Sequence, residues 1–185
     1  RKFSKRGDIL LTHFGISGPT ILNAAGDVAD LLYEGVVTAT MDMFPTKDIG
    51  ILDKELVALF DSNKNKLLRN TLPQLIPSSA VGTLLSLVPN ISPETKVHSV
   101  TKEERRALID VFKGLPITIS GLMGMSRAVV ADGGVALTEI DMRTMQSKKI
   151  ENLFVTGDLL DITRPSGGYS LQLCWTTGYL AGKNA

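Results

Sequence analysis

The residues whose types and spacing could do chemistry lie mainly near the C-terminal end of the sequence. Residues 152–156 predict a compact apolar strand, and Gly157 and Asp158 follow it at once. After a loop, Gly167 and Gly168 open a predicted helix. A glycine lets backbone approach a ligand closely, a carboxylate accepts hydrogen bonds from sugar hydroxyls, and a helix start offers free amides. The pattern suits a polar, partly anionic ligand, and an ordinary strand-to-helix turn explains it equally well.

A second candidate group lies at residues 12–19, near the start of the chain. Ser17 and Gly18 stand at a predicted helix start that could hold an anionic group of a substrate or a nicotinamide cofactor. His13 could act as an acid or base near neutral pH, and we assign no other catalytic candidate. The more ordinary interpretation is a helix capped by Ser17 and a histidine satisfied within the core. Ser17 is not expected to be a hydrolase nucleophile, because the glycine spacing of a nucleophile elbow is absent.

Composition excludes several classes of protein. The chain has 185 residues, 43% of them hydrophobic, and 20 Lys and Arg against 19 Asp and Glu, so its net charge of +1 gives no global attraction to nucleic acid. Its one cysteine, Cys174, and its two histidines argue against a disulfide framework and against a metal site. The aliphatic runs are too short to span a bilayer and no leader pattern opens the chain. We therefore expect a cytoplasmic protein with no membrane partner.

The elements that must position these residues predict an α+β protein in three parts. Hydrophobic periodicity and breaker residues divide the chain into a β-rich middle domain at 1–48 and 114–131, a helical insertion at 49–113, and a C-terminal strand–loop–helix segment at 132–185. Within the middle domain, strands are expected over residues 8–14 and 127–131. Within the insertion, Asp53 is expected to cap one helix, and Thr101 with Glu104 is expected to form a capping box before another.

Several segments together resemble the HI0933-like flavoproteins of the two-dinucleotide-binding-domain superfamily. The matching segments lie in order along the chain: residues 6–8 with 12–19, 132–135, 144–148, 152–161, 167–172 and 178–182. They span nearly the whole sequence, and the helical stretch between them is its least distinctive part. The resemblance implies that the C-terminal segment belongs to a Rossmann-like FAD-binding domain. It also implies flavin-mediated hydride or electron transfer, with NAD(P)H as a donor and an unknown small-molecule substrate.

The resemblance also implies roles for individual residues. Asp158, which follows Gly157, would hydrogen-bond the ribityl chain of FAD. The other cofactor-binding positions that it implies are Gly167, Gly168 and Tyr169, with amides near the flavin pyrimidine edge, then Ser170, Leu171 and Gln172 in the first helical turn, and Gly133 and Gly134 at the crossing from the middle domain. The dipole of the C-terminal helix would stabilise negative charge on reduced flavin. We expect the Tyr169 ring to be a core aromatic, and we expect Cys174, next to Trp175, to be a small buried side chain.

Two departures from the family pattern shape the expectation. Family members usually carry Glu where this chain has Asp158, and no Gly-x-Gly-x-x-Gly fingerprint for the FAD diphosphate occurs. Together with a first residue other than methionine, this predicts a C-terminal fragment whose partner is the missing N-terminal half of the same polypeptide. We expect the isolated chain to be inactive and to bind FAD weakly or not at all. The alternative is an interaction or RNA-binding module with vestigial flavin motifs, against which the near-neutral charge argues.

Overall fold

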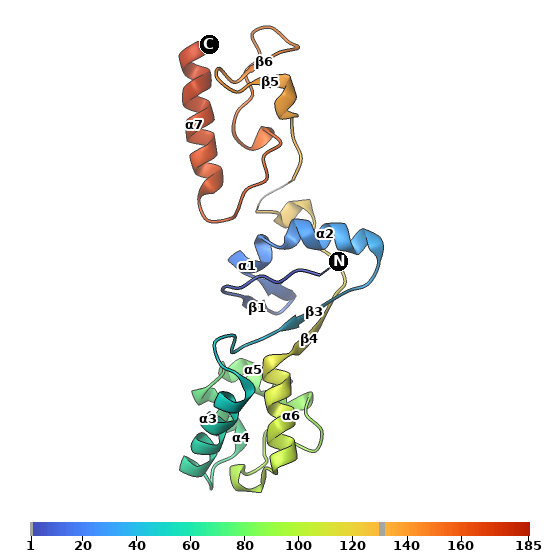
Figure 1. The fold of residues 1–185 in the computed structure, drawn as a ribbon, viewed down its shortest axis with the longest axis vertical. Helices are drawn as coiled ribbons and strands as arrows, with labels where there is room; N and C mark the ends of the chain where they lie inside the picture. The colour runs from blue at the N-terminus through green and yellow to red at the C-terminus, as the bar shows by residue number, and fades with distance from the viewer. Residues whose placement is uncertain (1, 130–131) are drawn as a thin grey trace. The chain divides into compact units, whose positions relative to one another are not determined.

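The computed structural model describes residues 2–129 and 132–185, and within them the chain forms two compact units (Figure 1). The first is discontinuous in sequence, with residues up to Val37 joined by those from Ser120 onward, and we call it the discontinuous unit. The second, Thr38–Ile119, is called the helical unit. Helices and small two-stranded sheets make up both, so the α+β class expected from the sequence holds. The expected three-part division stays a prediction.

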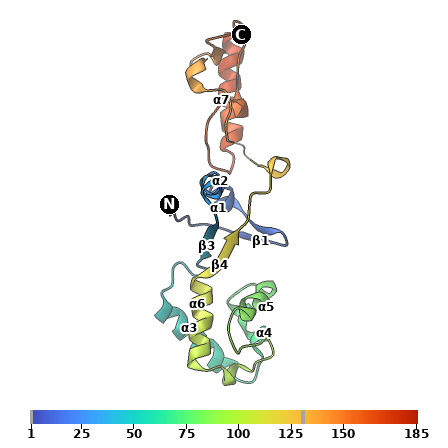
Figure 2. The ribbon, with the colours of Figure 1, turned by 90° about the vertical axis from the view of Figure 1, so that its right-hand side faces the viewer.

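The helical unit contains three main helices and several short turns (Figure 2). Its elements are α3 (Ile49–Ser62), α4 (Leu68–Thr71), η1 (Leu72–Gln74), α5 (Ser78–Ser86), η2 (Val97–Ser99), α6 (Lys102–Lys113) and β4 (Leu115–Ile119). β4 pairs with β3 (Val37–Met41) in a two-stranded sheet. α3 and α6 lie side by side in both views and contact each other.

A single apolar core holds the helical unit together. From α3, Leu52, Leu56 and Phe60 point into it at a spacing of four residues, and Leu108 and Phe112 enter it from α6. All but Phe60 are fully buried. Side chains four apart on a helix share one face, so each helix buries one apolar stripe.

Polar contacts at the helix ends correct one expectation and confirm another. Asp53 does not cap α3: the cap is Asp48, whose carboxylate accepts a hydrogen bond from the Ile51 amide at 2.7 Å. The capping box of Thr101 and Glu104 at the start of α6 is present as predicted. Asp53 fails as a cap because it lies one turn inside α3, where its carboxylate faces α6 instead.

There the Asp53 carboxylate accepts two hydrogen bonds from Arg105, at 2.7 and 3.4 Å. The bond from Arg105 lowers the pKa of Asp53, partial burial opposes that change, and the charges of Arg105, Lys102 and Arg106 lower the pKa further. This forked pair ties α3 to α6 across 52 residues of sequence.

The discontinuous unit is built from short elements. They are β1 (Leu10–Thr12), β2 (Gly15–Ser17), α1 (Pro19–Leu22), α2 (Ala25–Glu34), η3 (Met125–Arg127), η4 (Leu137–Glu139), β5 (Ile140–Asp141), β6 (Gln146–Ser147), η5 (Gly157–Leu159) and α7 (Tyr169–Asn184). β1 pairs antiparallel with β2, and β5 pairs antiparallel with β6. A small second core joins Ile140, Met145, Val155, Leu160 and Ala181. No helix among the described residues is long and apolar enough to cross a bilayer.

Three local expectations in this unit were wrong in detail. The strand expected over residues 8–14 is a hairpin, since Thr12 faces Gly15 and the chain reverses between them. The strand expected over residues 152–156 is reduced to an isolated bridge between Gln146 and Phe154. Its first residue, Asn152, has φ +59, which extended backbone does not allow. In the strand expected over residues 127–131, Arg127 ends a 3₁₀ turn and residues 130–131 lie outside the described ones.

Candidate functional site

The candidate site begins at the turn η5, which packs against the inner face of α7. The Gly157 amide donates a hydrogen bond to the buried hydroxyl of Thr177 at 2.9 Å. Gly157 has φ +61, and a Cβ there would lie 2.8 Å from the Cys174 sulfur. A glycine is therefore needed for both conformation and space, and this contact places Asp158, the next residue, at the edge of η5 beside α7.

The Asp158 side chain lies in solvent on one side and contacts an arginine on the other. It is 60% exposed, and its Oδ1 forms an ion pair with the Arg164 guanidinium, whose side chain is only 6% exposed. Arg164 also donates hydrogen bonds to Ser170 Oγ at 2.8 Å and to the Ile162 carbonyl at 2.6 Å. Arg164 matches none of the sequence motifs considered for the site. The only local signal for Arg164 is its place between an acidic turn and a helix start. The burial of its charge, which distinguishes it from other arginines, cannot be read from the sequence.

The helix α7 begins at Tyr169, directly after the two glycines where the sequence predicted a helix start. Gly168 caps the helix with φ +94, and the Gln172 amide is the first to reach back, to the Gly168 carbonyl at 3.1 Å. The amides of Tyr169, Ser170 and Leu171 precede it in the first turn, where a helix offers no acceptor of its own. Donors there point out along the positive end of the helix dipole.

A surface depression of about 310 Å³ lies beside this helix start. It is lined by Ile162, Arg164, Tyr169, Gln172, Leu173 and Thr176. The Tyr169 ring, expected in the core, is 58% exposed, and Cys174, expected to be buried, is also exposed. Both lie on α7: Tyr169 is at its start, and Cys174 stays exposed although its sulfur lies close to Gly157 of η5.

Gly134 lies at a close backbone crossing with the end of η5 and the residues that follow it, and Gly133 lies next to it in the chain. The Val135 amide donates to the Leu159 carbonyl at 2.8 Å, and the Asp161 amide donates to the Val135 carbonyl at 3.1 Å. A Cβ on Gly134, whose φ is +151, would lie 2.6 Å from the Leu159 oxygen. Gly134 is thus needed where the two segments touch, and Gly133 faces open space.

The second candidate group does not converge into a site. His13 is exposed and meets the Phe14 ring edge-on at 4.8 Å, so it is not a core histidine. Ser17 lies in β2 and does not cap the helix; Gly18 is the cap, with no side-chain hydrogen bond. Since α1 has four residues, its dipole is too short to hold an anion strongly.

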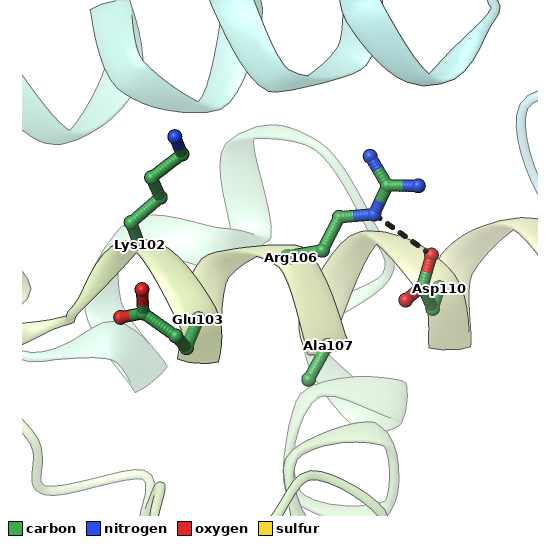
Figure 3. Close-up of a pocket in the computed structure, with 5 residues that line it drawn as sticks. All are labelled: Lys102, Glu103, Arg106, Ala107 and Asp110. Carbon is green, nitrogen blue, oxygen red and sulfur yellow. Dashed lines mark ion pairs between the residues drawn. The ribbon is translucent and has the colours of Figure 1, made fainter.

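A larger depression, of about 410 Å³, lies on the outer face of α6 (Figure 3). It is lined by Lys102, Glu103, Arg106, Ala107 and Asp110, all from one helix. Arg106 and Asp110, one turn apart, form an exposed ion pair at 3.2 Å. The charges follow a single solvated helix face and pair along it, so this depression has no convergent chemistry.

Comparison with known proteins decides the family. A family described as the HI0933-like protein barrel and H2TH domain matches residues 1–130, well over half of the chain. The chain belongs to the HI0933-like family. This confirms the resemblance that the sequence motifs indicated.

Three relatives of known activity cover almost the whole chain. It is 30% identical to a 3-dehydro-bile acid delta(4,6)-reductase of Clostridium scindens over 97% of the chain and 44% of that protein. It is 27% identical to the ribosomal RNA dihydrouridine synthases of Haemophilus influenzae and Escherichia coli, over 92% and 94% of the chain and 40% and 41% of those proteins. The chain therefore spans less than half the length of each of these HI0933-like relatives.

Proposed function

We propose that this chain is the C-terminal part of an FAD-dependent oxidoreductase. The observation that carries the proposal is the exposed carboxylate of Asp158 beside the open N-terminal turn of α7. This donor set fits FAD, since a carboxylate accepts hydrogen bonds from ribityl hydroxyls and helix amides favour negative charge. The depression lined by Arg164, Tyr169 and Gln172 adds room on the same side. Bound FAD would supply hydride or electron transfer.

In this proposal each matched residue has a defined task. Asp158 accepts hydrogen bonds from the ribityl chain. Gly167, Gly168 and Tyr169 turn their amides toward the pyrimidine edge of the flavin. Ser170, Leu171 and Gln172 continue that turn, whose dipole favours negative charge on the reduced cofactor. Gly133 and Gly134 carry the chain from the middle domain into the FAD-binding domain.

The outer face of α7 supports a missing N-terminal half as the structural partner. Leu171, Trp175 and Tyr179 follow one another four residues apart and are 57%, 66% and 71% exposed. Thr177 and Ala181, on the opposite side, are buried. An apolar stripe of this kind is normally covered in a folded protein. We propose that the N-terminal half, carrying the diphosphate-binding strand and helix, covers it in a cytoplasmic enzyme.

The relatives suggest the class of reaction. A delta(4,6)-reductase and a dihydrouridine synthase both carry names that describe addition of hydrogen across carbon–carbon double bonds. We propose the same class here, with NAD(P)H as the hydride donor and a small molecule as the substrate. The two kinds of relative act on a steroid and on RNA, so they leave the substrate of this protein open.

Flavin absorbance after purification tests the proposal. The full-length gene product should carry stoichiometric FAD, and the isolated 185-residue chain should carry little or none, because the part proposed to bind the diphosphate would be absent. A colourless full-length protein that does not take up added FAD would contradict the flavoenzyme proposal. Stoichiometric FAD on the isolated chain would contradict the division of the site between two halves.

A second candidate function, RNA binding by the helical unit, is favoured by one cluster of basic side chains. The Val97 amide donates to the Lys66 carbonyl at 3.0 Å and the His98 amide to the Lys64 carbonyl at 3.3 Å. This backbone pairing brings the exposed Lys64, Lys66, Lys96 and His98 side chains together from two segments 30 residues apart. Asp61 offsets part of the charge through an ion pair with Lys64 at 3.5 Å.

Salt dependence of RNA binding separates this alternative from the first proposal. If the cluster binds phosphates, single-stranded RNA should bind at low salt with log K falling by about 0.7 per contact against log salt. Lys66→Ala with Lys96→Ala should weaken binding and flatten that slope. Lys54→Ala with Lys102→Ala, which removes two exposed lysines elsewhere in the unit, is the matched control. Equal binding by both pairs of variants would remove the cluster as an RNA site.

A further inference from the structure

Arg164 is a buried cation beside the N-terminal turn of α7, where the helix dipole disfavours positive charge. Its side chain is 6% exposed, and it contacts Ser170 in the first turn of α7. The positive end of the helix dipole lies at that turn, so it repels the guanidinium. Removing a charge from water is also strongly unfavourable unless an ion pair and hydrogen bonds compensate. Arg164 has that compensation from Asp158, Ser170 and the Ile162 carbonyl.

The three contacts of Arg164 join the separate segments that form the proposed site. Asp158 lies in η5, Ile162 lies in the loop that follows, and Ser170 lies in the first turn of α7. A planar guanidinium holds its acceptors in fixed directions, which a flexible ammonium group does not. Arg164 engages Oδ1 of Asp158 and leaves that side chain 60% exposed, so the carboxylate is oriented without being enclosed.

We propose that Arg164 is a positioning residue of the FAD site, an inference that rests on the proposed function. It holds the Asp158 carboxylate and the first turn of α7 in one arrangement. It also neutralises Asp158, so the positive end of α7 acts on the flavin without being cancelled by a neighbouring carboxylate.

This electrostatic role predicts a specific pattern of variants. In Arg164→Met the Asp158 carboxylate is left uncompensated beside the cofactor, where it repels the negative charge of reduced flavin. Reduced FAD should then bind about tenfold more weakly relative to oxidised FAD, which lowers the two-electron reduction potential by about 30 mV. Adding Asp158→Asn removes the stray charge and should return the potential toward the wild-type value, although Arg164 is still missing.

Arg164→Lys separates charge from geometry. The lysine retains the positive charge, so the reduction potential should stay near the wild-type value. It cannot reach Asp158, Ser170 and the Ile162 carbonyl together, so FAD affinity should fall by about tenfold. This conservative variant also keeps the test informative if Arg164→Met does not fold.

The experiment measures FAD affinity and reduction potential on the full-length protein. Titration of apoprotein with FAD gives the affinity through flavin fluorescence, and equilibration with a reference dye gives the potential. Arg143→Met, which removes an exposed arginine from the turn between β5 and β6, is the control and should change neither quantity. We expect the Arg164→Met shift and its reversal by Asp158→Asn.

The outcomes distinguish the two levels of inference. If the wild-type protein does not bind FAD, the proposed function itself is wrong. If the wild-type protein binds FAD but Arg164→Met keeps the wild-type potential, Arg164 is only structural and the inference is overturned. A shift that Asp158→Asn does not reverse also overturns it, because the effect then does not come from the carboxylate.

Discussion

The backbone crossing at Gly134 provides the sharpest test of how the candidate site is built. Gly134→Ala adds one methyl group at a point where two backbone segments touch. That Cβ would lie 2.6 Å from the Leu159 oxygen, 2.7 Å from the Leu160 carbonyl carbon and 2.8 Å from the Asp161 nitrogen, whereas ordinary contacts begin at 3.4 Å. All three are backbone atoms, so no side-chain rotation relieves the overlap and the segments must separate.

The expected loss follows from two contributions. An alanine at φ +151 is strained by about 1–3 kcal/mol. Separation of the segments stretches the hydrogen bonds from Val135 to Leu159 and from Asp161 to Val135, now 2.8 and 3.1 Å long. Each contributes about 1 kcal/mol. Gly134→Ala should therefore destabilise the crossing by about 3–5 kcal/mol.

Amide hydrogen exchange measures this locally on the 185-residue chain. The Val135 and Asp161 amides are the donors in the crossing, and their exchange should accelerate by a factor of more than about 100. The matched control is Gly133→Ala, where φ is +98 but no atom lies within 4 Å of the added Cβ. That variant should lose only the stability that corresponds to the backbone strain, and its two hydrogen bonds should stay intact. Equal exchange in the two variants would refute the argument that the close approach requires Gly134.

Three further predictions concern other contacts. Gly157→Ala should lower the melting temperature, and Cys174→Ala in the same chain should recover part of the loss, because the sulfur is the atom 2.8 Å from the new Cβ; no recovery would contradict this contact. Asp53→Asn should remove about 0.5–1 kcal/mol of stability, in keeping with its partly exposed pair with Arg105. Arg105 lowers the pKa of Asp53, so this stability is present above the ordinary value of 3.8 and is lost as the pH falls through the lower native value. In urea unfolding at acid pH, the free energy of unfolding of the variant should therefore fall less steeply with decreasing pH than that of the wild type. Leu108→Ala should cost about 2–5 kcal/mol in urea unfolding, because the side chain is fully buried in the core of the helical unit; a loss below 1 kcal/mol would place Leu108 outside a packed core.

Local sequence signals predicted one helix start correctly and another wrongly, although both caps join partners within one turn. The Thr101 and Glu104 capping box is the correct one, and its hydrogen bonds join residues three apart. The prediction of Asp53 as the cap of α3 was wrong, because the helix begins at Ile49 and its cap is Asp48. Asp53 lies inside the helix and pairs with Arg105 of α6, a tertiary contact that the sequence does not show.

Burial was the property that sequence predicted least well. The Tyr169 ring and Cys174 were expected inside and are exposed, and residues 152–156 were expected to form a strand and make only one bridge. An apolar residue type indicates that a surface needs covering, but the covering element decides whether it is buried. In this chain the described residues cover only the inner face of α7.

By itself, the sequence determined the family, the α+β class and the start of a helix directly after Gly168, because local motifs and hydrophobic periodicity carry these properties. Only the tertiary structure decided that Arg164 neutralises Asp158 and that Gly134 crosses the backbone at Leu159. The physical reason is that desolvation and steric overlap depend on which atoms meet in space. A buried arginine and an exposed arginine look the same in the sequence, and only the packing around the side chain decides whether its charge is desolvated.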